Sequence, residues 1–321
     1  MHRIARGLMA LAFGAVVAAS TAFAQQVSIA IATGGPGGVY YPLGIGMADV
    51  LSKHLTGAAA VARVTGGSID NLKLVGTRQC DVAFSMVDAA VDAVRGQGKF
   101  RSGKVAARTL MVLYPNRMHV VTIAGNGIET MADLTGKRVS IGPSGSATEL
   151  MALRVIEAVG LDKDKSMRRQ RLEVSESVKA LKGGRLDAFF WVGGLPTAAV
   201  AELAVTPDLK IKLIDQADAV EAMNRKYGGI YSAGVIPAKT YPGQDKDNAI
   251  AIVQNILVAD ASLPDATAYS IVKALIERRD QLIAVHDEAR SISVVNQSAR
   301  NSPIPWHPGA AKYFKEKGAA M

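Results

Sequence analysis

Small polar residues and glycines gather at four points of the sequence, each directly after a short apolar stretch. Four glycines, a proline and two tyrosines fall within Thr33–Tyr41. The other points are Thr65–Asn71, Pro143–Thr148 and Trp191–Gly194. Turns of this composition expose backbone N–H groups and present the start of a helix to a bound anion. The first turn is neither a P-loop nor a dinucleotide fingerprint, because no Gly-Lys-Ser/Thr follows it and the G-x-G-x-x-G spacing fails.

Each of these turns also has a structural explanation when it is taken alone. A purely structural turn needs one or two glycines, and Ser68 can simply cap a helix. The four turns together favour binding, because ligands of open parallel sheets lie outside the carboxyl ends of the strands. We therefore expect one cleft to collect all four turns, two from each half of the chain.

Short apolar strands and amphipathic helices alternate around these turns. The expected strands are 27–32, 61–65, 81–85, 109–114, 119–124, 138–141, 171–174, 187–192 and 249–258. A turn at 114–116 is expected to separate two of them, and a helix is expected from Ser175, capped by Ser175 or Ser177. This alternation predicts an α/β fold in which helices cover parallel sheets.

The chain also holds two segments of similar pattern, 72–81 and 178–187, each a helix followed by a turn, an aspartate and a buried strand. Chance similarity of two βα units is the alternative to two related halves. We favour two lobes, the first formed by residues 25–118 and 237–321 and the second by residues 119–236. Two chain crossings between the lobes make a hinge, which allows closure around a ligand.

Signatures of catalysis and metal binding are poor, so we expect no catalytic residue, no metal site and no cofactor. None of the five histidines has the spacing of a metal site, and no G-x-S-x-G elbow is present. His119 lies in an expected strand, where packing or hydrogen bonding explains it. Asp81 and Asp187 begin strands, at the wrong end for a carboxyl-end site, and are expected to hold turns. Cys80 is the single cysteine, expected to be a buried, inert thiol.

The composition is that of a globular protein, with 49% apolar and 20% charged residues among 321. Residues 1–24 show a positive start, an apolar run and the small-x-small pattern of Ala22–Ala24, which together predict a cleaved export signal and a periplasmic location. A membrane anchor is the alternative, but the apolar run is short and rich in Ala and Gly. The net charge of +9 comes without a nucleic-acid recognition motif, so we expect no nucleic-acid partner.

On these residues the sequence resembles the TAXI family, the extracytoplasmic solute receptors of one class of TRAP transporters. The resemblance covers nearly the whole mature chain. Its motifs are Ala32–Gly44, Thr65–Asn71, Leu134–Val139, Gly142–Thr148, Asp187–Pro196, Ile236–Gln244 and Pro303–Ala310. Each motif alone is weakly specific, and the set is highly specific.

The resemblance implies a type II periplasmic-binding-protein-like fold, with two α/β lobes joined by a two-strand hinge. It implies a receptor that captures a small organic anion, such as glutamate or 2-oxoglutarate, and delivers it to TRAP permease subunits. We expect a monomer, because no long exposed apolar helix indicates a coiled coil. Mapped onto this chain, the ligand contacts are Thr33, Gly34, Gly35, Tyr40, Tyr41, Ser68, Asn71, Ser85, Ser144, Ser146, Thr148, Trp191 and Gly194. Because the motifs place no Arg in this set, a carboxylate would be held by N–H groups, hydroxyls and helix dipoles.

Three alternatives remain open at this point. A periplasmic enzyme on the same bilobal scaffold would need an acid–base pair with perturbed pKa values in the cleft. An orphan ligand sensor would bind a solute without a permease. A structural or interaction protein would have no enclosed polar cavity between the lobes.

Overall fold

The computed structural model describes residues 27–321, and the export signal expected at residues 1–24 lies outside these. Within the described residues, every helix is too short or too polar to cross a membrane. The chain begins with β1 (Val27–Ala32), α1 (Tyr40–His54), β2 (Ala58–Arg63), α2 (Ser68–Gly76), β3 (Val82–Met86), α3 (Val87–Arg95) and a short 3-10 helix, η1 (Gly98–Phe100). These elements form the first lobe together with the end of the chain.

The middle of the chain builds the second lobe. It runs β4 (Ala107–Ile123), η2 (Met131–Leu134), β5 (Arg138–Ser140), α4 (Ala147–Ala158), β6 (Arg168–Gln170), α5 (Val174–Lys182), β7 (Ala188–Gly193), α6 (Ala198–Ala204), β8 (Ile211–Leu213), α7 (Ala219–Tyr227) and β9 (Tyr231–Ile236). The chain returns through β10 (Asn248–Asp260), α8 (Asp265–Glu277), α9 (Arg279–Val285), η3 (Asp287–Ser291), η4 (Val294–Asn296) and α10 (Pro308–Glu316).

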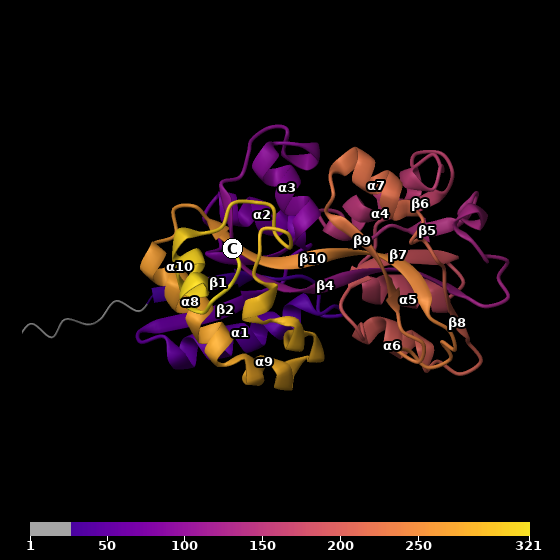
Figure 1. The fold of residues 1–321 in the computed structure, drawn as a ribbon. Helices are drawn as coiled ribbons and strands as arrows, with labels where there is room; N and C mark the ends of the chain where they lie inside the picture. Colours follow the sequence, from indigo (N-terminus) through magenta and orange to yellow (C-terminus); the bar gives the residue numbers. More distant parts are fainter. Residues whose placement is uncertain (1–26) are drawn as a thin grey trace, which may run out of the picture.

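One sheet joins the two lobes, in the order β2-β1-β3-β10-β4-β7-β5-β6. β1 pairs in parallel with β2 and β3, and β5 pairs in parallel with β6 and β7. The long strands β4 and β10 are antiparallel to each other and to their neighbours, and both run from one lobe into the other (Figure 1). The fold is therefore the α/β, type II periplasmic-binding-protein-like arrangement, two lobes joined by two strands.

The lobe boundaries expected after residues 118 and 236 remain a proposal, and strand pairing suggests another position for the second of them. Asn255 to Ala259 of β10 pair with β3 in the first lobe, whereas Asn248 to Val253 pair with β9 in the second. Tyr241 and Ile250 share a hydrophobic core with Phe189 of β7. We therefore propose that the return crossing lies inside β10, near residue 254, rather than at residue 237.

Several elements differ from the sequence-based expectations. The strands expected at 109–114 and 119–124 form one continuous strand, β4, and Pro115 pairs with Gln254 beside a register shift that tolerates it. The strand expected at 171–174 forms earlier in the chain, as β6 at Arg168–Gln170. Glu173, rather than a serine, caps α5 through a reciprocal pair with Glu176.

The two aspartates at the strand starts were expected to hold turns, and the structure shows each one bonded to a neighbouring strand. The Asp81 carboxylate accepts a hydrogen bond from the N–H of Ala30 at 2.8 Å. Asp187 accepts from the N–H of Arg138 at 2.7 Å and pairs with its guanidinium group, which lowers the pKa of Asp187. His119 is buried between the carbonyl of Arg117 and the hydroxyl of Tyr241, and burial lowers its pKa to about 4.

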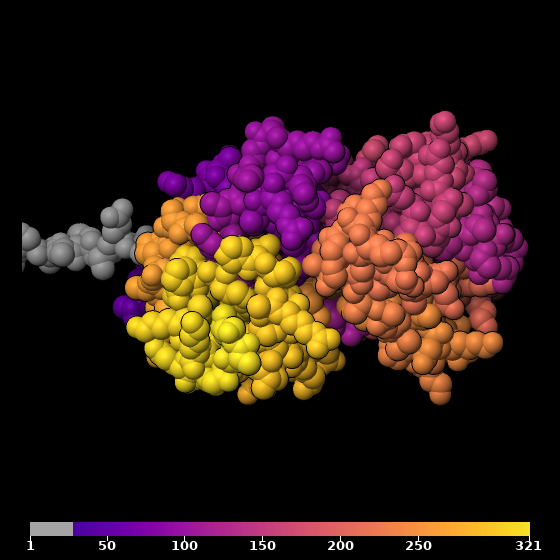
Figure 2. Space-filling view, turned by 45° about the horizontal axis from the view of Figure 1, so that its top comes forward, coloured from indigo at the N-terminus to yellow at the C-terminus, as the bar shows by residue number. Residues whose placement is uncertain are grey.

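The two lobes meet along one seam. Figure 2 shows the orange residues of the second lobe against the purple and yellow residues of the first. The site lies within this seam, because the strands of both lobes direct their carboxyl ends toward it.

Candidate functional site

Turns from both lobes enclose one cavity at the carboxyl ends of the parallel strands. Turns after β1 and β2 contribute from the first lobe, and the turns after β5 and β6 contribute from the second. The fourth expected turn, at 191–194, is mostly strand, because its lining residues Trp191, Val192 and Gly193 form the end of β7. The space open to the centre of a water molecule is about 40 Å³, a few times the roughly 10–15 Å³ that one water needs. The lining residues are Gly34, Gly35, Gly38, Val39, Tyr40, Gly66, Gly67, Ser68, Met86, Tyr114, Asn116, Pro143, Ser146, Ala147, Thr148, Glu173, Trp191, Val192 and Gly193.

The structure brings part of the sequence-predicted set to this cavity. The predicted residues that line it are Gly34, Gly35, Tyr40, Ser68, Ser146, Thr148 and Trp191. They come from all four turns, so the expected convergence is present in the geometry. Their contacts with a solute remain a proposal.

Three other predicted residues support the turns from beneath. The Asn71 amide donates to the carbonyls of Thr33 at 2.6 Å and Phe84 at 2.8 Å. The Thr33 hydroxyl donates to the carbonyl of Arg63 at 2.7 Å, and the Ser85 hydroxyl donates to that of Met86 at 3.0 Å. Because these polar groups are satisfied by the backbone, they position the turns and do not line the cavity.

The last three predicted residues lie away from the lining. Tyr41 is half-buried in the first turn of α1, and Ser144 is exposed. Gly194 packs closely, since a Cβ there would lie 2.7 Å from Cγ of Glu288 and 3.1 Å from the Tyr114 ring. A glycine is therefore needed at this position for packing.

Sequence reasoning missed a polar group contributed by the hinge strands. Tyr114 and Asn116 of β4 line the cavity, although the pattern there indicated a turn. The Asn116 amide donates to Oδ1 of Asn255 at 2.8 Å, and the Tyr40 hydroxyl donates to the same oxygen. Among the described residues, the Tyr114 hydroxyl and Asn116 Oδ1 have no hydrogen-bond partner although both are fully buried. Leaving such atoms unpaired is costly, and these two lie in the wall of the cavity.

The electrostatics of the cavity come from helix starts and one acid. α1 and α2 begin without a side-chain cap, and α4 begins at Ser146, whose hydroxyl accepts from the N–H of Glu149 at 3.1 Å. The N-termini of helices attract negative charge. Lys and Arg are missing from the lining, and Glu173 is its one carboxylate. Burial, aided by Glu176, raises the pKa of Glu173 to about 6.

Glycines let the lobes approach closely around the cavity. A Cβ on Gly37 would lie 2.4 Å from the Ser175 hydroxyl, and one on Gly38 would lie 2.8 Å from the Trp191 ring. The N–H of Asp70 donates across the seam to the carbonyl of Gly145 at 3.1 Å. The glycine-rich turn is thus a contact surface between lobes as well as a wall of the cavity.

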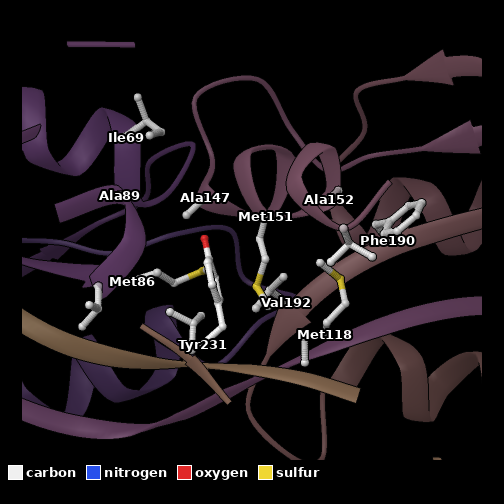
Figure 3. Close-up of a cluster of buried hydrophobic side chains, with 14 of the residues drawn as sticks. Ile69, Met86, Ala89, Met118, Ala147, Met151, Ala152, Phe190, Val192 and Tyr231 are labelled. Atoms are coloured by element: carbon white, nitrogen blue, oxygen red, sulfur yellow. The ribbon is translucent and has the colours of Figure 1, made fainter. Parts of the chain in front are cut away.

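A hydrophobic cluster continues from one lobe into the other beside the cavity. Met86 and Ile69 of the first lobe pack in one cluster with Ala147, Met151 and Val192 of the second (Figure 3). Unbranched methionines adapt to changing neighbours, which suits a surface that closes and opens.

A buried charge cluster ties the same lobes together. The Arg154 guanidinium of α4 contacts the Asp92 carboxylate of α3 at 2.6 Å and donates to the Tyr231 hydroxyl at 2.8 Å. Tyr231 donates in turn to Asp88 at 2.9 Å. We call these four residues the interlobe charge cluster.

A larger hollow of about 580 Å³ lies elsewhere, between the end of α1 and α8. His54, Lys273 and Glu277 are among its lining residues, which all belong to the first lobe. It does not share residues with the interlobe cavity, so closure of the lobes does not enclose it.

A solved structure with a TM-score above 0.5 shows that the fold is shared. A protein of Bordetella bronchiseptica RB50 matches with 19% identity and a TM-score of 0.52, over 91% of this chain and 89% of that one. The periplasmic aliphatic sulphonate binding protein SsuA from Escherichia coli matches with 14% identity and a TM-score of 0.46, over 90% and 83%. The substrate binding protein of an amino acid ABC transporter matches with 14% identity and a TM-score of 0.49, over 82% and 99%.

One protein-family model matches almost every described residue of the chain. The model of the NMT1-like family matches residues 31–318, which include all four turns around the cavity and both hinge strands. The chain belongs to the NMT1-like family.

Proposed function

We propose that this protein is an extracytoplasmic solute receptor that captures a small organic anion between its lobes. The observation that carries the proposal is a single cavity walled by turns of both lobes, into which the hinge strands present buried, unpaired polar atoms. Tyr114 and Asn116 supply these atoms. A solute bound there would complete their hydrogen bonds and link the lobes at the same time.

The case for an acidic solute rests on the helix starts. α1, α2 and α4 all begin at the lining, and hydroxyls of Ser68, Ser146 and Thr148 lie beside them. N–H groups and helix dipoles can hold a carboxylate without a cationic side chain. The TAXI resemblance supports a solute such as glutamate or 2-oxoglutarate.

The resemblance also supports the cellular setting that we propose. Residues 1–24 would direct export and be removed before Gln25, leaving a periplasmic monomer that delivers its solute to TRAP permease subunits. The mass of the protein recovered from a periplasmic fraction tests the cleavage. A mass that includes residues 1–24 would contradict it.

We propose binding without covalent chemistry, because the lining offers no activated nucleophile. Ser146 donates its hydroxyl proton to the carbonyl of Pro143 at 2.7 Å, and Ser68 accepts from the N–H of Met86 at 3.1 Å. Among the lining residues of the described chain there is no histidine to serve as their base. Turnover of a bound solute by purified protein would establish an enzyme instead.

A thermal-shift screen of dicarboxylates, amino acids and oxo-acids tests the proposal. A true ligand at a hundredfold excess over its Kd stabilises the folded state by about 2.7 kcal/mol. We expect at least one small organic anion to raise the unfolding temperature in proportion to the logarithm of its concentration. A flat response to the whole panel would reject an anion receptor.

A further inference from the structure

Glu173 brings a carboxylate to the cavity that no cation of the protein neutralises. None of the ion pairs within residues 27–321 includes Glu173. Its Oε2 lies against the first lobe, 2.8 Å from the place of a Cβ on Gly35. The carboxylate therefore sits where the two lobes meet, at the wall formed by the glycine-rich turn.

A solute with only negative charges fits poorly beside this group. The cavity is lined by no Lys or Arg that would offset two neighbouring carboxylates. Like charges in a partly buried site repel each other strongly. Either Glu173 takes up a proton when such a solute binds, or the solute carries a positive charge of its own.

The rest of the lining suits a positive charge near Glu173. Tyr40, Tyr114 and Trp191 line the same cavity, and aromatic rings are common neighbours of bound ammonium groups. Trp191 also lies close to the turn that Glu173 contacts, since a Cβ on Gly38 would meet its ring at 2.8 Å.

A different pair of turns forms a wall of opposite polarity. Gly67, at the start of α2, faces Ser146, at the start of α4, with 3.6 Å between the place of a Gly67 Cβ and the Ser146 Cα. Helix starts attract negative charge. The Asp70 carboxylate lies in the first turn of α2, against Gly66 and Gly145 and outside the cavity lining, so the solute's carboxylate would meet the N–H groups of these starts from the cavity side. The cavity is therefore bipolar, with helix starts at one pair of turns and a carboxylate at another.

We infer that Glu173 pairs with a protonated amine of the solute, so that the cavity selects a zwitterion of the α-amino-acid type over the same acid without its amine. This inference rests on the proposed receptor function and names the class of its solute. Glu173 acts as a specificity-determining residue, and the helix starts of α2 and α4 hold the carboxylate.

Calorimetric titration with matched probe pairs tests the inference. The pairs are L-glutamate with glutarate, L-glutamine with 5-amino-5-oxopentanoate, and L-leucine with 4-methylpentanoate, all near pH 7.5. For the pair that fits the cavity, we expect the amine-bearing member to bind at least tenfold more tightly. Equal binding of the two members, or preference for the amine-free acid, overturns the inference.

Variants locate the preference on one side chain. Glu173→Gln keeps an oxygen that can cap α5 but removes the charge, and we expect it to reduce the preference for the amine at least tenfold. Glu202→Gln removes a charge from an exposed position on α6 and should leave the preference unchanged. An unaltered preference in Glu173→Gln also overturns the inference.

The pH dependence of the preference supplies a further test, in which the wild type is compared with Glu173→Gln. The other titratable groups of the lining are Tyr40 and Tyr114, whose pKa values burial raises, and Glu176 lies on the same helix as Glu173. Asp70 and Asp88 lie outside the lining, and burial raises the pKa of both, that of Asp88 to about 6, so only a pH effect that Glu173→Gln lacks belongs to Glu173. The preference for the amine should therefore decline as the pH falls from about 7.5 to about 5.5, where Glu173 becomes protonated. A preference independent of pH contradicts the pairing.

The outcomes separate this inference from the receptor function. If amine-free acids bind as well as their amine-bearing partners, the receptor function stands and the role of Glu173 is rejected. If every pair fails to bind, the inference is rejected, and the receptor function is decided by the wider thermal-shift panel.

Discussion

Buried polar atoms without a protein partner are the most informative residues of this molecule. The hydroxyl of Tyr114 lies in the cavity wall, 1% of the residue being exposed, and no described group bonds it. Replacing an unsatisfied buried polar group with an apolar one of the same shape is close to neutral for stability. The cost of removing it should therefore appear in binding alone.

Tyr114→Phe tests this separation. We expect the variant to unfold at the wild-type temperature or above, while its affinity for the solute falls roughly five- to tenfold, as for the loss of a hydrogen bond worth about 1–1.5 kcal/mol. Thermal denaturation and calorimetry measure the two effects. Tyr313→Phe is the matched control, because the Tyr313 hydroxyl is also buried without a partner but lies in α10. Equal loss of affinity in both variants would contradict the assignment.

At this scale the sequence predicted the residues of the turns better than those of the hinge. Gly35, Ser68 and Thr148 lie in strand-to-helix turns or in the first turn of the helix that follows, so local pattern was enough to place them at the cavity. Tyr114 and Glu173 reach it through long-range pairing and a helix cap, which no local period reveals. One sequence signal could have pointed to Glu173. It lies three residues before Glu176, which is the spacing of a reciprocal cap at the start of a helix, here α5.

Among the elements, the glycine-rich turn between β1 and α1 controls how closely the lobes approach. A Cβ on Gly37 would lie 2.4 Å from the Ser175 hydroxyl and 2.9 Å from Val174 Cγ1, both on the opposing lobe. Overpacking of a tight contact costs roughly 1–3 kcal/mol. A side chain at Gly37 should therefore oppose closure without disturbing either lobe.

Gly37→Val tests the role of this turn. We expect the affinity for the solute to fall roughly tenfold or more, because the added side chain would clash with Val174 and Ser175 where the lobes meet around the cavity. The unfolding temperature without solute should remain close to that of the wild type. Gly229→Val is the control, since a Cβ at Gly229 meets no atom within 4 Å. Unchanged affinity in Gly37→Val would show that the turn does not limit closure.

The interlobe charge cluster gives a second, pH-dependent link between elements. Asp88 of α3 is fully buried, and this burial raises its pKa to about 6 although Arg154 and Tyr231 oppose the shift and Asp92 adds to it. A carboxyl whose native pKa lies above its unfolded value stabilises the fold at low pH, and this contribution is lost as the pH rises through about 6.

Comparison with Asp88→Asn isolates this contribution. We expect the free energy of unfolding of the wild type, relative to the variant, to decrease between about pH 5 and about pH 7.5. Urea denaturation at several pH values measures the difference. A difference that stays constant, or increases with pH, would contradict the raised pKa of Asp88.

The order and type of most elements could be predicted from the sequence, because strand and helix periods are local. The alternation around β1, α1 and β2 is an example. The continuity of β4 could not be predicted in this way. Pro115 normally interrupts a strand, and only its pairing with Gln254 beside a register shift in β10 explains why the strand continues.

For the whole molecule, the proposed function would make binding and lobe movement one process through the two long strands. β4 and β10 carry the chain between the lobes, β4 places Tyr114 and Asn116 in the cavity wall, and Asn255 of β10 accepts a hydrogen bond from Asn116. A solute that bonds these residues and the turns of both lobes favours the closed arrangement by the difference in its affinity for the two states.

A crystal structure of the protein with the solute identified by thermal shift tests the central claim most directly. The account predicts that the solute lies in the cavity between the lobes and contacts Ser68 of the first lobe and Thr148 of the second. A solute seated in the hollow between α1 and α8, or held by one lobe alone, would contradict it.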